Sequence, residues 1–280
     1  MQEIIEFRMI ETDAQKYLPD DVGVPIGKSN FVRKVVIDTN DPLMTEIGKI
    51  DRKRRAEGDI FFTSWEIRRK YSDLELANAA LLKLVVKKVF EPSGEECGTK
   101  YDDKSACPEC GSGAKQITPL FLNGRRLPKK VDFAKTIADE VIVSRRVVDV
   151  FQSSGATGAK FESVSLANAI GEKSDDWYQP IVQAAPVEMH SNTRFGSNPF
   201  DNEQYGRCPR ADLLGLNILS EVWVQEHSFD QSDIVCTRQF NGVRRGLLRP
   251  ERSLLISNRL WRLFQRHGIS GHEVEVVHFV

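Results

Sequence analysis

Residues 144–164 read SRRVVDVFQSSGATGAKFESV, and residues 257–277 read SNRLWRLFQRHGISGHEVEVV. The two stretches align without a gap at a shift of 113 residues, and their apolar positions coincide. Identical pairs include Ser144/Ser257, Arg146/Arg259, Phe151/Phe264, Gln152/Gln265, Gly155/Gly268, Gly158/Gly271 and Glu162/Glu275. A repeat of this kind predicts that the fold contains one substructure twice.

The similarity continues upstream of these stretches at a shift of 101 residues. Asp132–Thr136 (DFAKT) matches Asp233–Thr237 (DIVCT), and a Cys-Pro pair begins at both Cys107 and Cys208. The second copy therefore holds 12 more residues between its two matching blocks. We place them in the Gly- and Arg-rich stretch 239–252, where they predict an enlarged surface loop, because a longer loop costs little free energy.

Each copy shows the pattern of a strand–helix–strand unit. Strands are expected at 117–122 and 141–143 in the first copy, and at 221–225 and 254–256 in the second. The serine that follows the second strand of each copy is a good helix N-cap, and a glycine stands where a left-handed C-cap is expected. The apolar positions between them lie on one helical face. One unit alone cannot bury its helix, so we expect the copies to pack together.

The N-terminal part shows a different pattern. Residues 1–65 contain short apolar runs separated by turn-rich stretches, which predict strands and irregular loops. Ser72 and Glu75 form a capping box that predicts a helix reaching to about Leu84. A strand is expected over 85–90. The charge cluster Asp51–Glu57 is typical of a solvated surface.

The predicted fold class is α+β, with a strand-rich N-terminal portion and one capped helix, then two related strand–helix–strand units and a zinc-ribbon-like cysteine loop. The sequence divides into four predicted segments. They are an N-terminal α+β portion (1–90), the cysteine loop with the first repeat (91–167), an irregular aromatic loop (168–205) and the second repeat (206–280).

The bulk composition favours a soluble, cytoplasmic, globular protein. The chain has 280 residues, a formal charge of −1 and 40% hydrophobic residues. No apolar run approaches the roughly 20 residues that cross a bilayer, and the first residues lack a signal-peptide pattern. The near-neutral charge makes a dedicated nucleic-acid binder an unfavoured class. Five cysteines in such a protein favour metal ligation or buried thiols over disulfides.

A zinc-knuckle pattern occurs at Cys107-Pro-Glu-Cys110-Gly111. Ten residues before Cys107, Cys97-Gly98 resembles a second knuckle whose first cysteine position is Gly94. The predicted ligands of a structural Zn²⁺ are Cys97, Cys107, Cys110 and Cys208. Three sources remain open for the fourth ligand: Cys208, a histidine such as His190, or water at a catalytic site. A degenerate ribbon that binds no metal is the remaining alternative.

Other chemistry-bearing patterns are weak. The sequence has no nucleophile elbow, phosphate loop, dinucleotide fingerprint or H-E-x-x-H helix. The Gly-x-x-Gly segments at 155–158 and 268–271 predict simple turns. Asp132 and Asp233 are expected to cap turns through side-chain bonds to the backbone. Two basic loops, 125–130 and 244–252, could contact an acidic partner or nucleic acid.

A partner-binding surface is expected in two places. The loop 168–205 contains several aromatic side chains, which suit interface anchors, among them Trp177 and Tyr178. The Arg-rich stretch 239–252 contributes Arg244, Arg245 and Arg249 to the predicted surface.

The combination of Glu-Cys97-Gly, Cys107-Pro-Glu-Cys110-Gly, Asp132–Thr136 and the 141–158 segment resembles the double-CXXCG-motif proteins and the related immunity proteins of bacterial polymorphic-toxin systems. The likeness covers roughly 94–164 and returns over 205–280. It implies a protein that neutralises a cognate toxin by direct binding without being an enzyme. It also implies structural zinc, with Cys97, Cys107 and Cys110 as ligands. The alternatives are a zinc-ribbon-containing nucleic-acid-associated protein and a metalloenzyme with an open zinc position.

Overall fold

The computed structural model of the chain describes residues 1–280 except 28–29, 170, 202–206 and 214–216. The chain divides into two compact units, Met1–Glu75 and Leu76–Val280. Residues 76–90, which the sequence analysis assigned to the N-terminal portion, thus belong to the second unit. Of the predicted loop 168–205 and repeat 206–280, residues 170, 202–206 and 214–216 lie outside the described residues.

The N-terminal unit is an antiparallel sheet with two helices, α1 (Glu11–Tyr17) and α2 (Pro42–Ala56). In sheet order its strands are β2 (Val24–Ile26), β3 (Val32–Asp38), β1 (Gln2–Ile10) and β4 (Ser64–Lys70). One sheet face buries Ile5, Phe7 and Met9, and α2 adds the buried Ile47.

Neither helix was predicted, and the interpretation of Asp51–Glu57 as a solvated surface is wrong in part. The cluster lies in the last turns of α2, where Asp51 is buried and pairs with Arg55 at 2.9 Å. A local signal was available at the start of α2. The Asp41 carboxylate accepts a hydrogen bond from the Leu43 amide at 2.8 Å, and a proline occupies the first helical position.

The capping box of Ser72 and Glu75 forms as expected, since Ser72 donates to Glu75 and the Glu75 amide donates back to the Ser72 hydroxyl. The helix it opens, α3 (Asp73–Asn78), ends six residues before Leu84, so the predicted length is wrong. Residues Leu81–Val86 form strand β5 instead. Leu81 and Leu82 are both fully buried, on opposite faces of a central strand, and such burial favours extended chain over helix.

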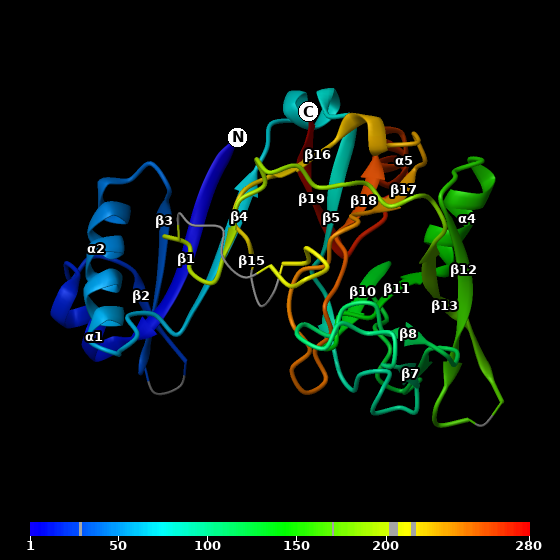
Figure 1. Cartoon of the computed structure of the whole chain (residues 1–280), viewed down its shortest axis with the longest axis horizontal. Helices are drawn as coiled ribbons and strands as arrows, with labels where there is room; N and C mark the ends of the chain where they lie inside the picture. Colours follow the sequence, from blue (N-terminus) through cyan, green and yellow to red (C-terminus); the bar gives the residue numbers. More distant parts are fainter. Residues whose placement is uncertain (28–29, 170, 202–206, 214–216) are drawn as a thin grey trace. The chain divides into compact units, whose positions relative to one another are not determined.

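The second unit contains a five-stranded sheet in which β5 is the central strand. In sheet order the strands are β16 (Val222–Val224), β19 (His272–Phe279), β5, β18 (Leu254–Ser257) and β17 (Ile234–Cys236). In Figure 1 the cyan strand β5 lies between β18 and β19, which are drawn in orange and red. Strand β5 therefore completes a sheet whose other strands follow it by more than 130 residues.

The other large sheet of the unit has six strands. In sheet order they are β6 (Val89–Phe90), β10 (Phe133–Thr136), β11 (Val141–Ser144), β13 (Lys173–Val182), β12 (Ala159–Leu166) and β9 (Phe121–Leu122). Strand β13 corrects the prediction of an irregular loop over 168–205, because ten residues of that stretch form a strand that pairs with β11 on one side and with β12 on the other.

Five strands of the six-stranded sheet repeat the order and directions of the five-stranded sheet. The series β9-β12-β13-β11-β10 corresponds to β16-β19-β5-β18-β17, with one parallel pair at the start and antiparallel pairs thereafter. The two sheets differ in where the central strand originates. Strand β13 follows β12 directly, whereas β5 precedes every other strand of its sheet.

The two aligned stretches follow the same backbone path. Strand β11 leads into helix α4 (Arg145–Ser153), and strand β18 leads into helix α5 (Asn258–Arg266), each of nine residues. Left-handed Gly155 and Gly268 follow the helices at φ 64° and 61°. One shared core contains apolar side chains of both helices and of both sheets; its buried members include Phe133, Val147, Phe151, Ile256, Leu260 and Phe264.

The two copies contact each other through reciprocal bonds. Asp132 accepts from Ser144 of its own copy at 2.7 Å and from the Ser270 amide of the other copy at 3.0 Å. Asp233 likewise accepts from Ser257 at 2.6 Å and from the Thr157 amide at 3.0 Å. These aspartates do cap turns, and the turns belong to the partner copy.

Two arginines complete the same arrangement. Arg146 pairs with Asp132 at 3.0 Å and donates to the carbonyl of His267 in the other copy. Arg259 pairs with Asp233 and donates to the carbonyl of Ser154. The five residues that each copy contributes to these bonds therefore occupy matching positions in the two copies.

The rest of the second unit consists of short elements. They are the hairpins β7 (Tyr101–Asp102) with β8 (Lys115–Gln116) and β14 (Phe195–Gly196) with β15 (Asn217–Ile218), and the 3₁₀ turn η1 (Glu226–Ser228). None of the helices in the described part of the chain has the length and apolarity of a membrane-crossing segment.

Candidate metal site and binding surface

Three cysteines that are far apart in the sequence form a buried thiol cluster. The Sγ atoms of Cys107, Cys110 and Cys208 all lie within 4.8 Å of one another, and each residue is less than 5% exposed. Cys110 and Cys208 are separated by 3.6 Å between sulfur atoms. In a tetrahedral zinc site with Zn–S near 2.3 Å, two sulfurs lie about 3.8 Å apart. The cluster therefore has the dimensions and the donor atoms of a thiolate metal site.

Two similar turns hold the thiols. In the first, the Cys107 amide donates to the Ser112 carbonyl at 2.8 Å, and the amide of left-handed Gly111 donates to the Cys107 carbonyl at 2.8 Å. In the second, the Cys208 amide donates to the Asp212 carbonyl at 3.2 Å, and the amide of left-handed Ala211 donates to the Cys208 carbonyl at 2.8 Å. Each Cys-Pro pair thus begins a knuckle-like turn.

Backbone amides of these turns point at the sulfur atoms. The amides of Cys110 and Glu109 lower the pKa of the Cys107 thiol, which favours the thiolate that a metal needs. Burial raises the pKa of Cys208 to about 11, against the effect of the Arg210 and Asp212 amides. A buried thiol of high pKa loses its proton readily only when a cation takes the proton's place.

The predicted ligand set is brought together in part. Cys107, Cys110 and Cys208 lie in the thiol cluster, but Cys97 is outside it. Cys97 follows a Ser93–Glu96 capping arrangement in which Ser93 and Glu96 bond each other, and Gly94 donates to Glu140 at 2.7 Å. This segment is held by its own hydrogen bonds. No histidine of the described chain belongs to the cluster, and the Nδ1 atom of His190 accepts from the Asn192 amide.

The insertion 239–252 is a partly exposed loop, as predicted, and it lies over the thiol cluster. The Arg244 amide donates to the Cys110 carbonyl at 2.8 Å, and Val243 packs against the three cysteines. Because the first copy supplies Cys107 and Cys110 while the insertion belongs to the second, these contacts join the copies at the cluster.

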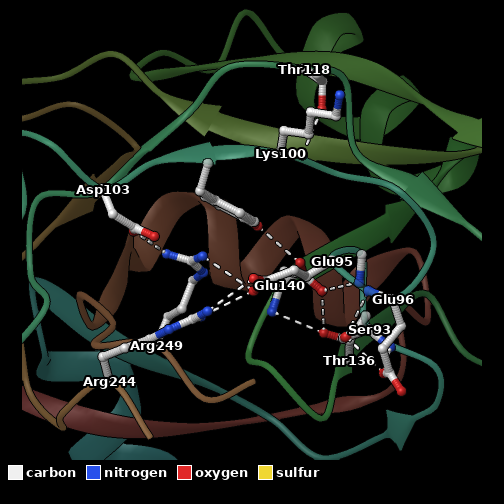
Figure 2. Close-up of polar contacts among 12 residues, drawn as sticks. Ser93, Glu95, Glu96, Lys100, Asp103, Thr118, Thr136, Glu140, Arg244 and Arg249 are labelled. Carbon is white, nitrogen blue, oxygen red and sulfur yellow. Dashed lines mark hydrogen bonds and ion pairs between the residues drawn. The ribbon is translucent and has the colours of Figure 1, made fainter. Parts of the chain in front are cut away.

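Two arginines of the insertion converge on one carboxylate, as Figure 2 shows. Arg244 donates to both oxygens of Glu95, at 3.0 and 2.9 Å, and Arg249 donates to Glu95 at 3.1 Å. The Arg244 guanidinium and that of Arg249 hold the pKa of Glu95 below its usual range. Arg249 also pairs with Asp103 and stacks on Tyr101 at 3.8 Å. These two predicted partner-binding arginines are thus engaged within the chain.

Below this ion-pair group, Glu140 is a buried acceptor for three neutral donors. It accepts from Gly94, from Tyr101 at 2.9 Å and from Thr136 at 2.5 Å. Burial, with Glu140 beside it, raises the pKa of Tyr101, so this phenol stays protonated. The arrangement fixes the loop that begins at Ser93 against β10.

Of the other predicted partner-binding residues, Trp177 and Tyr178 are buried and Arg245 is exposed. Trp177 and Tyr178 are 6% and 8% exposed because both lie in β13, where Trp177 joins one core cluster and Tyr178 the core shared by the helices. They therefore cannot serve as surface anchors in this fold. Arg245 is exposed, at the tip of the insertion.

The two histidines of β19 do not form a pair. His278 bonds Glu221 at 2.9 Å and stacks on Trp223. His272 contacts Phe133 and Phe264, and neither of its ring nitrogens has a hydrogen-bond partner. Burial lowers the pKa of His272. It is a core residue rather than a proton-transfer group.

An open cleft of about 870 Å³ lies beside the first copy, and sequence reasoning missed it. Its lining includes Lys129 and Lys130 of the basic loop 125–130 and the exposed carboxylates of Glu172, Asp175 and Asp176. Among the described residues, none of these five side chains has a hydrogen-bond or ion-pair partner. The charges come from 129–130 and from 172–176, two segments that are more than 40 residues apart in the sequence and line one cleft in the fold.

Comparison with family models and with curated proteins finds no match for this sequence. The case for its function therefore depends on the thiol cluster and on the cleft.

Proposed function

We propose that the chain is a non-enzymatic binding protein of the toxin-immunity type, which recognises another protein through the cleft beside the first copy. The observation that carries this proposal is the mixture of positive and negative side chains in the lining of the cleft. Protein interfaces match positive and negative groups across the contact, and such complementarity sets partner choice. The resemblance to immunity proteins supports the same class of partner.

The same mixture of charges counts against the nucleic-acid alternative. A phosphate backbone is bound by concentrated cations, and every contact with it releases counterions. Here Lys129 and Lys130 line the same cleft as the carboxylates of Glu172, Asp175 and Asp176, which would repel phosphates. The nucleic-acid alternative predicts that binding falls by orders of magnitude between about 50 and 200 mM salt, and the protein-binding proposal does not.

The metal of this proposal is a structural Zn²⁺ held by Cys107, Cys110 and Cys208. Thiolate donors favour zinc over the harder divalent cations. Burial of all three cysteines beneath the insertion supports a structural role over the metalloenzyme alternative, since a catalytic zinc must admit substrate. The five cysteines are free thiols, which supports a reducing, cytoplasmic location.

The duplication of one ancestral module also belongs to this proposal. It is supported by the matched strand order, by the two nine-residue helices and by the reciprocal bonds of Asp132 and Asp233. The two Cys-Pro turns, which meet at the thiol cluster, extend the correspondence to the metal site.

The test of the proposed function uses the full chain as bait for proteins of its source cell, followed by titration of each purified candidate. Changing Arg125, Lys129 and Lys130 to Glu should weaken binding by at least about tenfold, because charge complementarity is inverted. The matched control changes Arg52, Lys53 and Lys70 to Glu, three exposed cations of the N-terminal unit. A partner that binds both variants equally well, or a chain that binds only oligonucleotides, would refute the proposal.

A further inference from the structure

The two Cys-Pro turns are closed by the same kinds of backbone hydrogen bond, but the second turn is one residue shorter and the two carry unequal donors. The first supplies two thiols, Cys107 and Cys110. In the second, the position that follows Cys208 by three residues is Ala211, so only one thiol is present. A tetrahedral structural site requires four donors. If the two Cys-Pro turns alone form the site, the second turn must provide the fourth donor.

The next residue of that turn is Asp212, which is 5% exposed. Its Oδ2 atom lies 3.7 Å from the Cys208 sulfur, close to the ~3.5 Å expected between a sulfur and an oxygen that share a tetrahedral zinc. Its Oδ1 atom accepts from the Phe240 amide at 3.0 Å. The carboxylate is thus anchored by one oxygen while the other is directed at the thiol cluster.

The charge of Asp212 is otherwise unbalanced. No Lys, Arg or His of the described chain lies within ion-pair distance of this carboxylate, and its remaining contact is the Ser112 hydroxyl. A buried carboxylate without a cation is costly, and coordination of a metal is one of the few arrangements that remove the cost. The three thiols beside it have the same need once they ionise.

We propose that Asp212 is the fourth ligand of a Cys₃Asp zinc site. The proposal rests on the zinc site proposed above. The carboxylate lies outside the group of mutually close thiols, so ligation requires that Oδ2 turn from Ser112 toward Cys107. The hydrogen bond from the Phe240 amide to Oδ1 is retained when the carboxylate rotates in this way.

The test measures metal affinity of the full-length protein by competition with a chelator, using Zn²⁺, and the absorption spectrum of the Co²⁺ form. The variant Asp212→Asn should bind at least about tenfold more weakly, because a neutral amide replaces an anionic donor. Ser112→Ala should bind as tightly as the parent, since the hydroxyl only holds the carboxylate when metal is absent. Asp212→Cys should add a fourth thiolate and raise the charge-transfer absorbance per Co²⁺ by about a third.

The outcomes distinguish the role of Asp212 from the zinc site on which that role depends. A parent protein that binds no metal refutes the zinc site itself. A parent that binds zinc no better than Asp212→Asn refutes only the role of Asp212. Equal weakening by Asp212→Asn and Ser112→Ala also refutes it, because the carboxylate would then act through the hydroxyl. If Asp212→Asn fails to fold, the Asp212→Cys spectrum decides: three thiolates per Co²⁺ contradict the proposal and four support it.

Discussion

The two copies of the strand–helix–strand unit belong to two sheets with the same strand order, but the central strand of each sheet is connected differently along the chain. In the first copy the central strand β13 follows β12 through a short turn, whereas in the second copy the central strand β5 comes from residues before both copies. The helix, the glycine turn and the aspartate that caps the partner's turn are unchanged. The comparison indicates that local turn chemistry and the shared core specify the sheet, while the connection to its centre is free to vary.

The copies differ most in the segment between their two matching blocks. In the first, Thr136 and Glu140 close a tight turn; in the second, the insertion 239–252 extends over the thiol cluster, to which both copies contribute. The second copy thus has one thiol fewer in its turn than the first, and its insertion lies over the thiol cluster. The predictions below test how equivalent the copies are, from the largest expected effect to the smallest.

The strongest test concerns Gly158 and Gly271, which are left-handed and close to the other copy. A Cβ atom at Gly158 would meet the Ile234 carbonyl oxygen at 2.1 Å, and one at Gly271 would meet that of Phe133 at 2.4 Å. Changing either to Ala should cost roughly 3 kcal/mol or more in the free energy of unfolding.

The control for this test is Gly155→Ala, where φ is also positive but no atom lies within 4 Å of the new Cβ. It should cost only about 1 kcal/mol. Chemical denaturation of the three variants gives the comparison. Equal costs at all three positions would show that the copies do not approach as closely as described.

The reciprocal aspartates come next. Asp132→Asn and Asp233→Asn should each cost about 2–4 kcal/mol, because the amide lacks the charge that pairs with the arginine and replaces one acceptor oxygen by an NH₂ group that faces other donors. The bonds of Asp233 with Arg259, Ser257 and Thr157 outweigh burial and lower its pKa, so its contribution is present above its unfolded pKa and is lost as pH falls through the folded value. A cost for one variant several times that of the other would break the equivalence of the copies.

The ion-pair group around Glu95 should contribute less to the free energy of unfolding than the reciprocal aspartates do. Glu95→Gln is expected to cost about 1–2 kcal/mol, since the pair with Arg244 and Arg249 is partly exposed. The lowered pKa of Glu95 means that this contribution disappears as pH falls below the ordinary carboxyl range. Glu109→Gln, an exposed change in the same region, should have no measurable effect on thermal unfolding. A smaller effect for Glu95 than for Glu109 would contradict the role of the insertion as a cover.

The smallest effect concerns His272, whose aligned residue in the first copy is Ala159. Burial lowers the pKa of His272 below its usual value near 6.5, so the folded protein keeps it neutral while the unfolded chain takes up a proton. Stability should therefore fall as pH drops below about 6.5, until the folded value is reached. His272→Leu should reduce this acid sensitivity, and the exposed His227→Gln should leave it unchanged. Identical pH profiles for parent and His272→Leu would mean that the ring is solvated.

The sequence predicted the parts of the fold that local chemistry determines. The helices after Ser144 and Ser257, their glycine stops and the Ser72 capping box were predictable because caps and amphipathic spacing act within a few residues. The approach of Cys107 to Cys208 followed from the alignment of the Cys-Pro pairs. In each case the sequence pattern that predicts the feature is formed by the residues that make it.

The parts that failed depend on contacts distant in sequence. Leu81–Leu84 continued a helical pattern, yet these residues belong to strand β5, because they pair with β18 and β19 on either side. Trp177 and Tyr178 resembled interface anchors, but pairing with β11 and β12 buries them. Cys97 matched a knuckle pattern, although its segment bonds Glu140 instead. Asp212 was not predicted because it follows Cys208 by four residues, and a C-x-x-C knuckle places its second ligand three residues after the first.

The most direct measurement of the central claim, that both copies contribute thiols to one metal, is the zinc content of the full chain and of two cysteine variants. We predict one zinc per chain in the parent and in Cys97→Ser, and none in Cys208→Ser, because only Cys208 joins Cys107 and Cys110. Zinc that is absent from the parent, retained by Cys208→Ser, or lost from Cys97→Ser would contradict the account.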